Sequence, residues 1–174
     1  AVTAPAGGMQ MSGCASSTRL TESAASGEAR GRWFRTFATA DVQAAVAAML
    51  ARDAGIESIT GVYKNDDWGQ DIGRMAAAAF EAVGITVHAS IALNDGQPSY
   101  RAEATQALRD QPGALYLALY PTEGISFVRE WLGLGGTSVM IGANSLRSDD
   151  FRTTVGLANL GDFVGTDTSR PRVP

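Results

Sequence analysis

The stretch SITGVYKNDDWGQDIGRMAAAAFEAVGITVHASIAL, residues 58–93, decides the fold class. Residues 58–63 are short and partly β-branched, which predicts a strand. From Trp68 onward, apolar residues recur at helical spacing until Gly84, a residue typical of the end of a helix. Residues 85–93 then predict a second strand. A strand, a helix and a strand in this order form a βαβ unit, whose two strands run parallel.

The same alternation continues on both sides of this unit. The other predicted helices cover residues 41–54, 99–108, 123–132 and 148–154, and the other predicted strands cover 114–120, 138–143 and 162–166. The run 114–120 is almost continuously apolar, as a strand covered on both faces should be. The sequence therefore predicts an α/β fold, a doubly wound and mainly parallel sheet of five to six strands with helices on both faces.

Residues 1–34 do not follow this alternation. They are rich in Gly, Ser and Ala, with one possible strand at 8–12 and a loop that continues to Arg32. A further strand is predicted at 33–37. We expect residues 1–34 to be a segment appended to the α/β unit and not a second domain.

Composition excludes several classes of function. The chain has 174 residues, of which 45% are hydrophobic and 18% charged, and its net charge is −4. An acidic chain offers no general attraction for a polyanion, so nucleic-acid binding is not expected. A single cysteine, Cys14, excludes an internal disulfide, and a single histidine, His88, leaves little room for a metal site.

Polar residues and aromatics follow three of the predicted strands. They are Asn65-Asp66-Asp67-Trp68, Tyr120-Pro121-Thr122 and Asn144-Ser145. A doubly wound sheet binds ligands at the carboxyl ends of its strands, so these segments should converge on one edge. The sequence predicts the site at this edge.

Two local patterns have an alternative interpretation. An acidic pair after a strand, here Asp66 and Asp67, could hold Mg²⁺ or accept a phosphoryl group, although Asp67 serves better as a helix N-cap. Met11-Ser12-Gly13-Cys14 is similar to a lipoprotein cleavage box, but no apolar signal segment precedes it. We therefore expect Cys14 to be a buried or cleft-lining thiol.

Five motifs in order resemble one family. They are Met11-Ser12-Gly13-Cys14-Ala15-Ser16-Ser17-Thr18-Arg19-Leu20-Thr21, Trp33-Phe34-Arg35-Thr36, Asp41-Val42-Gln43, Asn65-Asp66-Asp67-Trp68-Gly69-Gln70, and the strand ends at Tyr120 and Gly142. This set is similar to the branched-chain amino-acid-binding family of periplasmic solute-binding proteins. The resemblance spans residues 9–168.

The resemblance implies two doubly wound lobes that close on a ligand, in proteins about twice as long as this chain. Residues 1–34 then correspond to a stub of the first lobe with its crossover. Residues 35–168 correspond to the second ligand-binding lobe, a flavodoxin-like unit of the type I fold. Residues 169–174 correspond to a truncated crossover tail.

The resemblance also implies the residues that bind the ligand. Backbone amides and a hydroxyl at Cys14, Ala15 and Ser16 would hold its carboxylate, and Trp68 and Tyr120 would line the cleft. The acidic residue that holds the ligand ammonium in the family aligns with Asn144, which is neutral. Asp66 is the candidate to replace it, and the change leaves room for an amide, a keto acid or an aromatic acid.

The resemblance implies a binding protein and not an enzyme, with no cofactor and no metal. Its partners would be a small amino-acid-like or carboxylate ligand and the membrane permease of an ABC importer. The location would be periplasmic or otherwise extracytoplasmic. A lipid anchor on the full-length protein is an open alternative. Two alternatives remain: a ligand-sensing domain of a signalling receptor with the same fold, and a flavodoxin-like enzyme that uses Asp66 and Asp67.

Overall fold

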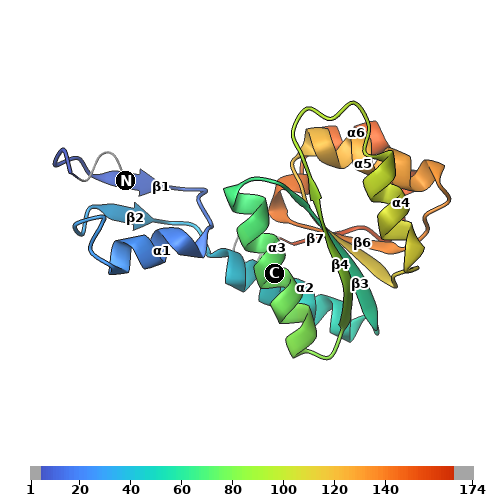
Figure 1. Ribbon diagram of the computed structural model, residues 1–174, viewed down its shortest axis with the longest axis horizontal. Helices are drawn as coiled ribbons and strands as arrows, with labels where there is room; N and C mark the ends of the chain where they lie inside the picture. The colour runs from blue at the N-terminus through green and yellow to red at the C-terminus, as the bar shows by residue number, and fades with distance from the viewer. Residues whose placement is uncertain (1–4, 167–174) are drawn as a thin grey trace, which may run out of the picture.

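A computed structural model describes residues 5–166, which form two units joined by residues 36–39 (Figure 1). We call residues 5–35 the N-terminal unit and residues 40–166 the main unit. The predicted tail 169–174 lies outside the described residues. Among the residues that are described, no helix is both long and apolar enough to cross a membrane.

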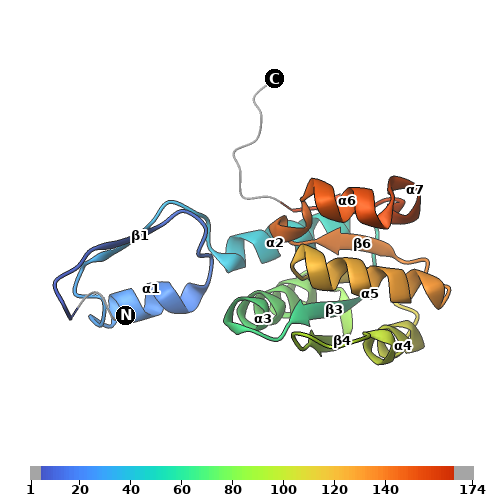
Figure 2. The ribbon, with the colours of Figure 1, turned by 90° about the horizontal axis from the view of Figure 1, so that it is seen from above.

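The N-terminal unit is small. In chain order it contains β1 (Gln10–Ser12), α1 (Thr18–Ala25) and β2 (Trp33–Arg35). The two strands pair in parallel, and α1 lies on one side of them (Figure 2). No residue of α1 is fully buried, so this unit has little core of its own.

The main unit contains the predicted alternation of helices and strands. In chain order its elements are α2 (Ala40–Asp53), β3 (Ser58–Lys64), α3 (Asp67–Ala82), β4 (Thr86–Leu93), α4 (Arg101–Arg109), β5 (Ala114–Ala118), α5 (Pro121–Gly133), β6 (Val139–Gly142), a 3₁₀ turn (Asn144–Leu146), α6 (Asp149–Val155), α7 (Leu157–Leu160) and β7 (Val164–Gly165).

The five strands of the main unit form one parallel sheet in the order β4-β3-β5-β6-β7. This is the order of a flavodoxin-like doubly wound sheet, and the predicted fold class is confirmed. The chain reverses its direction of winding between β3 and β5. A sheet of this type binds ligands at the carboxyl ends of the two strands that flank this switch point.

Helices cover both faces of the sheet, with α2 and α3 on one side and α4, α5 and α6 on the other (Figure 1). Successive side chains of β5 alternate between the two cores because side chains along a strand point to opposite faces. Leu115 and Leu117 pack with α4 and α5, whereas Tyr116 packs with α2 and α3. All five residues of β5 are buried, as its apolar run predicts.

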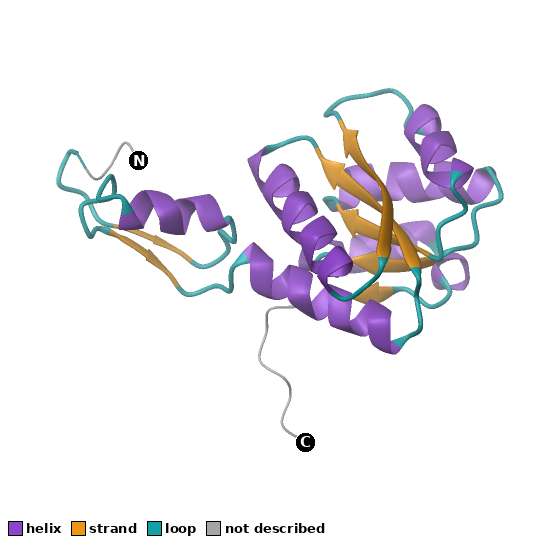
Figure 3. Ribbon diagram, turned by 60° about the horizontal axis from the view of Figure 1, so that its bottom comes forward, coloured by secondary structure: helices purple, strands orange, loops and turns teal. Residues whose placement is uncertain are grey.

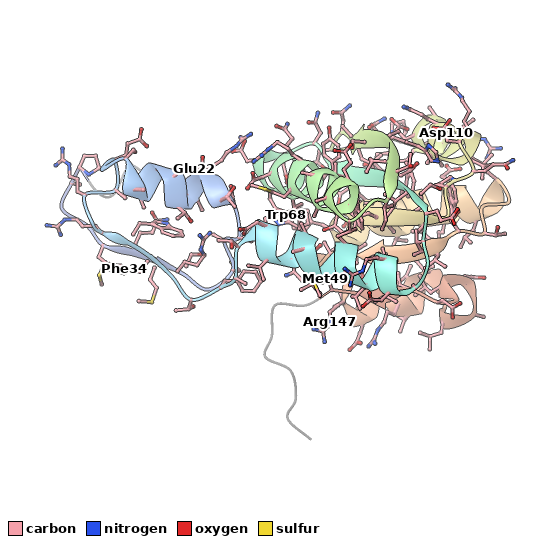
Figure 4. The ribbon with its side chains drawn as sticks, turned by 90° about the horizontal axis from the view of Figure 1, so that it is seen from below. Glu22, Phe34, Met49, Trp68, Asp110 and Arg147 are labelled. Atoms are coloured by element: carbon pink, nitrogen blue, oxygen red, sulfur yellow. The ribbon has the colours of Figure 1, made fainter. Side chains whose placement is uncertain are left out.

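The helix α2 begins beside the N-terminal unit and runs along the main unit (Figure 3). Apart from Gln43, its buried residues are all alanines: Ala40, Ala44, Ala47, Ala48 and Ala51. The larger apolar residues of the helix are exposed, including Met49, which is 51% exposed (Figure 4). Small side chains allow α2 to approach α3 and the sheet closely.

Two local predictions are wrong. The loop expected between the first two strands contains the helix α1, whose amphipathic pattern is short and buries no residue, so periodicity gave no clear signal. The N-cap of α3 is Asp66 and not Asp67: the Asp66 backbone is extended, and its side chain accepts a hydrogen bond from the Gly69 amide at 2.7 Å. Asp67 is the first helical residue.

Candidate functional site

A cavity of about 390 Å³ lies where the two units meet. Its lining comes from both units: Cys14, Ala15, Ser16, Ser17, Arg19 and Leu20 from the N-terminal unit, and Asp67, Trp68 and Tyr120 from the main unit. The volume lies within the range of pockets that hold small molecules. The side chains that a ligand would contact therefore come from three segments that are far apart in sequence, one in the N-terminal unit and two in the main unit.

Two stacked aromatic rings form the wall on the main unit. Trp68 follows β3 and Tyr120 follows β5, so they stand on the two sides of the switch point. Their ring centroids are 4.8 Å apart and their planes are inclined by 27°. In Figure 4, Trp68 lies between the two units. The predicted convergence of these two strand ends is confirmed.

The sequence after β3 explains why Trp68 takes this place. Asp66 caps α3 through the Gly69 amide, which satisfies one of the free N–H groups of the first helical turn. Gly69 also packs directly on the end of β3: a Cβ at this position would lie 2.0 Å from the Lys64 carbonyl oxygen. Only glycine therefore lets α3 turn so tightly, and this turn holds Trp68 at the sheet edge.

An ion pair joins the two strand ends behind the aromatic rings. The Lys64 ammonium group bonds to Glu123 in the first turn of α5, and it lies 3.1 Å from Asp95. It also lies 5.9 Å from the centre of the Tyr120 ring. The hydrogen bond that the Lys64 ammonium donates to the Glu123 carboxylate is the main cause that raises the pKa of Lys64, so the lysine is fully charged near neutral pH. The Lys64–Glu123 pair fixes β3 against the start of α5, which carries Tyr120.

Tyr120 itself is a neutral phenol in this site. Burial, followed by the negative charge of Asp66, raises the pKa of its hydroxyl above the ordinary tyrosine value. The residue is 39% exposed and lines the cavity, so it offers an aromatic face and a hydroxyl to a ligand.

A loop of small residues, 13–17 between β1 and α1, forms the opposite wall. The Ser12 hydroxyl accepts hydrogen bonds from the amides of Ala15 at 3.0 Å and Cys14 at 3.4 Å. These are two of the amides that the resemblance assigns to a ligand carboxylate. In the structure they already have a partner, which a ligand carboxylate would share or replace.

The carbonyl oxygens of the same loop accept hydrogen bonds from residues of both units. The Arg35 guanidinium, at the end of β2, donates to the carbonyl oxygens of Ala15 at 3.2 Å and Ser17 at 2.9 Å. The amide of Ala40, the first residue of α2, donates to the carbonyl oxygen of Ser16 at 2.8 Å. The loop is therefore anchored from both units.

A fully buried carboxylate, that of Asp71, connects the loop to α3. It accepts hydrogen bonds from the Ser17 hydroxyl at 2.9 Å and from the Thr18 amide at 2.8 Å. Arg74 donates to its other oxygen at 2.9 Å. Burial alone would raise the pKa of Asp71, but the bonds from Thr18, Ser17 and Arg74 outweigh it and hold the pKa below the ordinary carboxyl value.

Two of the residues predicted for the site lie outside the cavity lining. Asp66 uses a carboxylate oxygen to cap α3. Asn144 accepts a hydrogen bond from the buried side chain of Gln43 at 3.1 Å, and Gln43 also donates to Thr166 at 3.1 Å. The other predicted residues, Cys14, Ala15, Ser16, Trp68 and Tyr120, do line the cavity.

Sequence reasoning did not include Arg19 or Asp71 among the site residues, and it considered Asp67 only as part of the segment after β3 and of a possible metal or phosphoryl site, not as a ligand-binding residue. Asp67 and Arg19 bring opposite charges to the cavity lining. The position of Asp67 beside Trp68 gave a signal, since it follows the strand end directly. Nothing in the local sequence indicates that Asp71 meets the loop 53 residues earlier.

The proposed enzyme alternative needs a metal or phosphoryl site at Asp66 and Asp67. Within residues 5–166, no group of three or more His, Cys, Asp or Glu side chains could hold a metal ion. The engagement of Asp66 as a cap leaves one acidic side chain, Asp67, at the cavity.

The chain belongs to the periplasmic binding protein family, because residues 11–173 match the model of that family. Among curated proteins, no sequence matches this chain. The family and its fold neighbours are substrate-binding proteins and not enzymes.

Three solved structures illustrate the likeness. An extracellular ligand-binding receptor from Rhodopseudomonas palustris HaA2 is 17% identical with a TM-score of 0.79, over 89% of this chain and 42% of that one. A putative branched-chain amino acid ABC transporter protein from Rhodospirillum rubrum is 21% identical with a TM-score of 0.71, over 90% and 44%. An ABC transporter substrate-binding protein from Desulfitobacterium hafniense, in complex with Leu, is 19% identical with a TM-score of 0.65, over 83% and 42%.

At these low identities, the TM-scores show a shared fold, that of the type I periplasmic binding proteins. The chain spans less than half the length of each of the three.

Proposed function

We propose that this chain carries the ligand-binding surface of an extracytoplasmic solute-binding protein that captures a small amino-acid-like or carboxylate ligand for an ABC importer. In this proposal residues 1–34 belong to the first lobe, residues 35–168 form the second lobe, and residues 169–174 begin a crossover. The partner that receives the ligand is the membrane permease of the importer. The family and the type I fold support this assignment.

The observation that carries the proposal is the shared cavity. A loop of small residues from one unit faces two stacked aromatic rings from the other, at the switch point of a doubly wound sheet. A ligand there touches both units at once, so binding favours the arrangement in which they are closed. This is the behaviour that a binding protein needs in order to signal occupancy to a permease.

The charges at the cavity suit a zwitterion. The Asp67 carboxylate can accept from a ligand ammonium, and the Arg19 guanidinium together with the loop amides can donate to a ligand carboxylate. Trp68 and Tyr120 supply apolar faces for a side chain. In this arrangement Asp67 takes the ammonium role that the resemblance gives to the position of Asn144.

The test is a thermal-shift titration of the chain with aliphatic and aromatic amino acids, their amides and their keto acids. At about 100 times its dissociation constant, a ligand stabilises its target by about 2.7 kcal/mol. Because the chain contributes only part of the contacts of a two-lobed protein, we expect millimolar affinity, which corresponds to about −4 kcal/mol. A chain that shifts with none of these compounds would contradict the proposed ligand class.

A pair of variants then tests the role of Asp67. The substitution Asp67→Asn should abolish the response to amino acids and leave the response to keto acids, because only the ammonium loses its partner. Asp110→Asn is the matched control: this side chain is exposed, and in Figure 4 it lies at the far side of the main unit from Trp68. Equal responses of both variants to amino acids would exclude Asp67 from the site.

A further inference from the structure

We propose that Asp71 is a positioning residue: its carboxylate holds the loop that ends at Ser17 opposite Trp68 and Tyr120, so that the two walls of the cavity stay at binding distance. The effect that we expect this contact to have on ligand binding rests on the proposed function. The contact itself does not, because its hydrogen bonds join only residues of this chain.

The geometry makes Asp71 a bond between the two units. The residue lies in α3, one helical turn after the cavity-lining Asp67 and on the same face of the helix. Ser17 lines the cavity and donates to Asp71, so one side chain belongs both to the site and to the contact. Thr18 adds its amide at 2.8 Å and its hydroxyl at 3.2 Å.

The contact also completes the helix α1. Thr18 is the first residue of α1, and the side chain of its N-cap residue, Ser17, makes no capping bond within the helix. The first turn of α1 contains no acidic residue of its own. Asp71 therefore supplies, from the other unit, the negative charge that a helix N-terminus favours. If the units separated, α1 would lose its cap and the carboxylate would lose three of its donors.

The burial of Asp71 is consistent with a net favourable contact. A carboxylate with no exposed surface needs hydrogen-bond donors to offset the loss of water. Asp71 has donors from both sides: Ser17 and Thr18 across the boundary, and Arg74 one turn later on its own helix. Their combined effect lowers its pKa despite burial, so the ionised form is the one that the contact stabilises.

The single cysteine makes this proposal measurable. Cys14 is a free, exposed thiol that lines the same cavity as Trp68. A bimane group attached to Cys14 should be quenched by Trp68 while the two walls face one another. The variant Trp68→Phe defines the unquenched level. Trp33 lies in the same unit as Cys14, and Trp131 is fully buried, so neither reports a separation of the units.

We expect Asp71→Asn to raise the bimane emission to near the Trp68→Phe level, because the equilibrium between closed and open arrangements shifts on the order of tenfold when bonds to a charged group are lost. Ser17→Ala should give a smaller rise. Glu81→Gln is the matched control, since it removes one exposed carboxylate from the same helix and should leave the emission unchanged. Far-UV circular dichroism and the melting temperature of the main unit should stay as in the unmodified sequence.

Other outcomes would overturn the proposal. If Asp71→Asn and Ser17→Ala both leave the emission quenched while Trp68→Phe relieves it, Asp71 does not hold the walls together. If Trp68→Phe leaves the bimane emission unchanged, Cys14 and Trp68 do not face one another. The proposed role of the contact between Asp71 and the loop is then contradicted as well. Should Asp71→Asn not fold, Ser17→Ala decides, because it changes one hydroxyl at the boundary and no core residue.

Ligand binding separates this inference from the proposed function. For the unlabelled chain, Asp71→Asn should weaken the best compound of the thermal-shift series about tenfold without changing the order of preference among compounds. Unchanged affinity in this variant would remove Asp71 from the positioning role and leave the proposed function intact. A relief of quenching in a chain that binds no compound would leave the contact standing and contradict the proposed function.

Discussion

The main unit and the N-terminal unit are stabilised by different forces. The main unit buries apolar residues on both faces of its sheet, and Phe127 in α5 is fully buried there. In the N-terminal unit, Phe34 is 46% exposed and α1 buries no residue. This unit is attached through polar contacts instead, chiefly those of Asp71 with Ser17 and Thr18. Polar contacts at a boundary can break and re-form more readily than a packed core, which suits a hinge.

The exposed apolar residues of the N-terminal unit support its assignment to a larger lobe. Met9, Met11 and Phe34 are 67%, 65% and 46% exposed, and Phe34 points outward from the unit in Figure 4. A parallel sheet is ordinarily covered on both faces and has more than two strands. In the proposed two-lobed protein, further strands and a helix from the rest of the first lobe would cover these residues.

The largest difference between the two units should appear in a pair of matched substitutions. Phe127→Ala should lower the free energy of unfolding by about 3–5 kcal/mol, because it leaves a cavity in the core. Phe34→Ala should change it by about 0.5 kcal/mol or less, because the ring is already in contact with water. Urea denaturation of the two variants measures both values. Equal losses would contradict the view that the main unit alone carries the core.

The next largest effect on the free energy of unfolding should come from the ion pair between Lys64 and Glu123. Glu123→Gln leaves Lys64 with the exposed Asp95 as its remaining acidic partner, and we expect a loss of about 2–3 kcal/mol by urea denaturation. The tryptophan emission should also change, because the start of α5 positions Tyr120 against Trp68. Glu57→Gln, at an exposed position, is the control and should be neutral. An unchanged emission would mean that the stack does not depend on the pair.

Substitution of two helical glycines tests the tight turn after β3. Gly69→Ala places a methyl group against the Lys64 carbonyl oxygen and should cost about 1–3 kcal/mol, since the backbone of α3 must move. Gly133→Ala, at the end of α5, meets no atom within 4 Å and should be neutral or slightly stabilising. Thermal unfolding of the two variants distinguishes them. A neutral Gly69→Ala would show that the turn has room that the structure does not indicate.

The smallest expected effect concerns pH and the boundary between the units. The pKa of Asp71 in the folded chain is lowered, so the contact contributes fully above the ordinary carboxyl value of about 4 and is lost as pH falls through the lowered pKa. The bimane emission at Cys14 should therefore rise in acid before the main unit unfolds. Asp71→Asn should show no such step. A step of equal size in that variant would assign the transition to other carboxylates.

The main unit could be predicted from the sequence because its signals are local. The fully buried β5 appears as a continuous apolar run, and α3 appears as apolar residues at helical spacing closed by Gly84. The meeting of Trp68 and Tyr120 follows from these elements, since the carboxyl ends of β3 and β5 must lie side by side in a doubly wound sheet.

The rest depends on contacts between distant residues. Asp71 meets Thr18 across 53 positions, and no spacing rule connects a helical aspartate to a loop in another unit. The same reason explains Asn144, whose side chain is engaged by Gln43, 101 positions earlier. The helix α1 was missed because it buries no residue. The sequence alone therefore predicted that Trp68 and Tyr120 meet at one edge of the sheet, and it did not predict the bonds that bring the N-terminal loop to them.

Hydrogen exchange with and without ligand tests most directly whether the site is shared by the two units. The ligand is the compound with the largest thermal shift, at a concentration that saturates the chain. We predict that residues 13–18 in the N-terminal unit and residues 66–70 and 119–121 in the main unit gain protection together, because one molecule contacts both walls of the cavity. Protection confined to one unit, or to segments away from the cavity, would contradict a ligand site at the boundary.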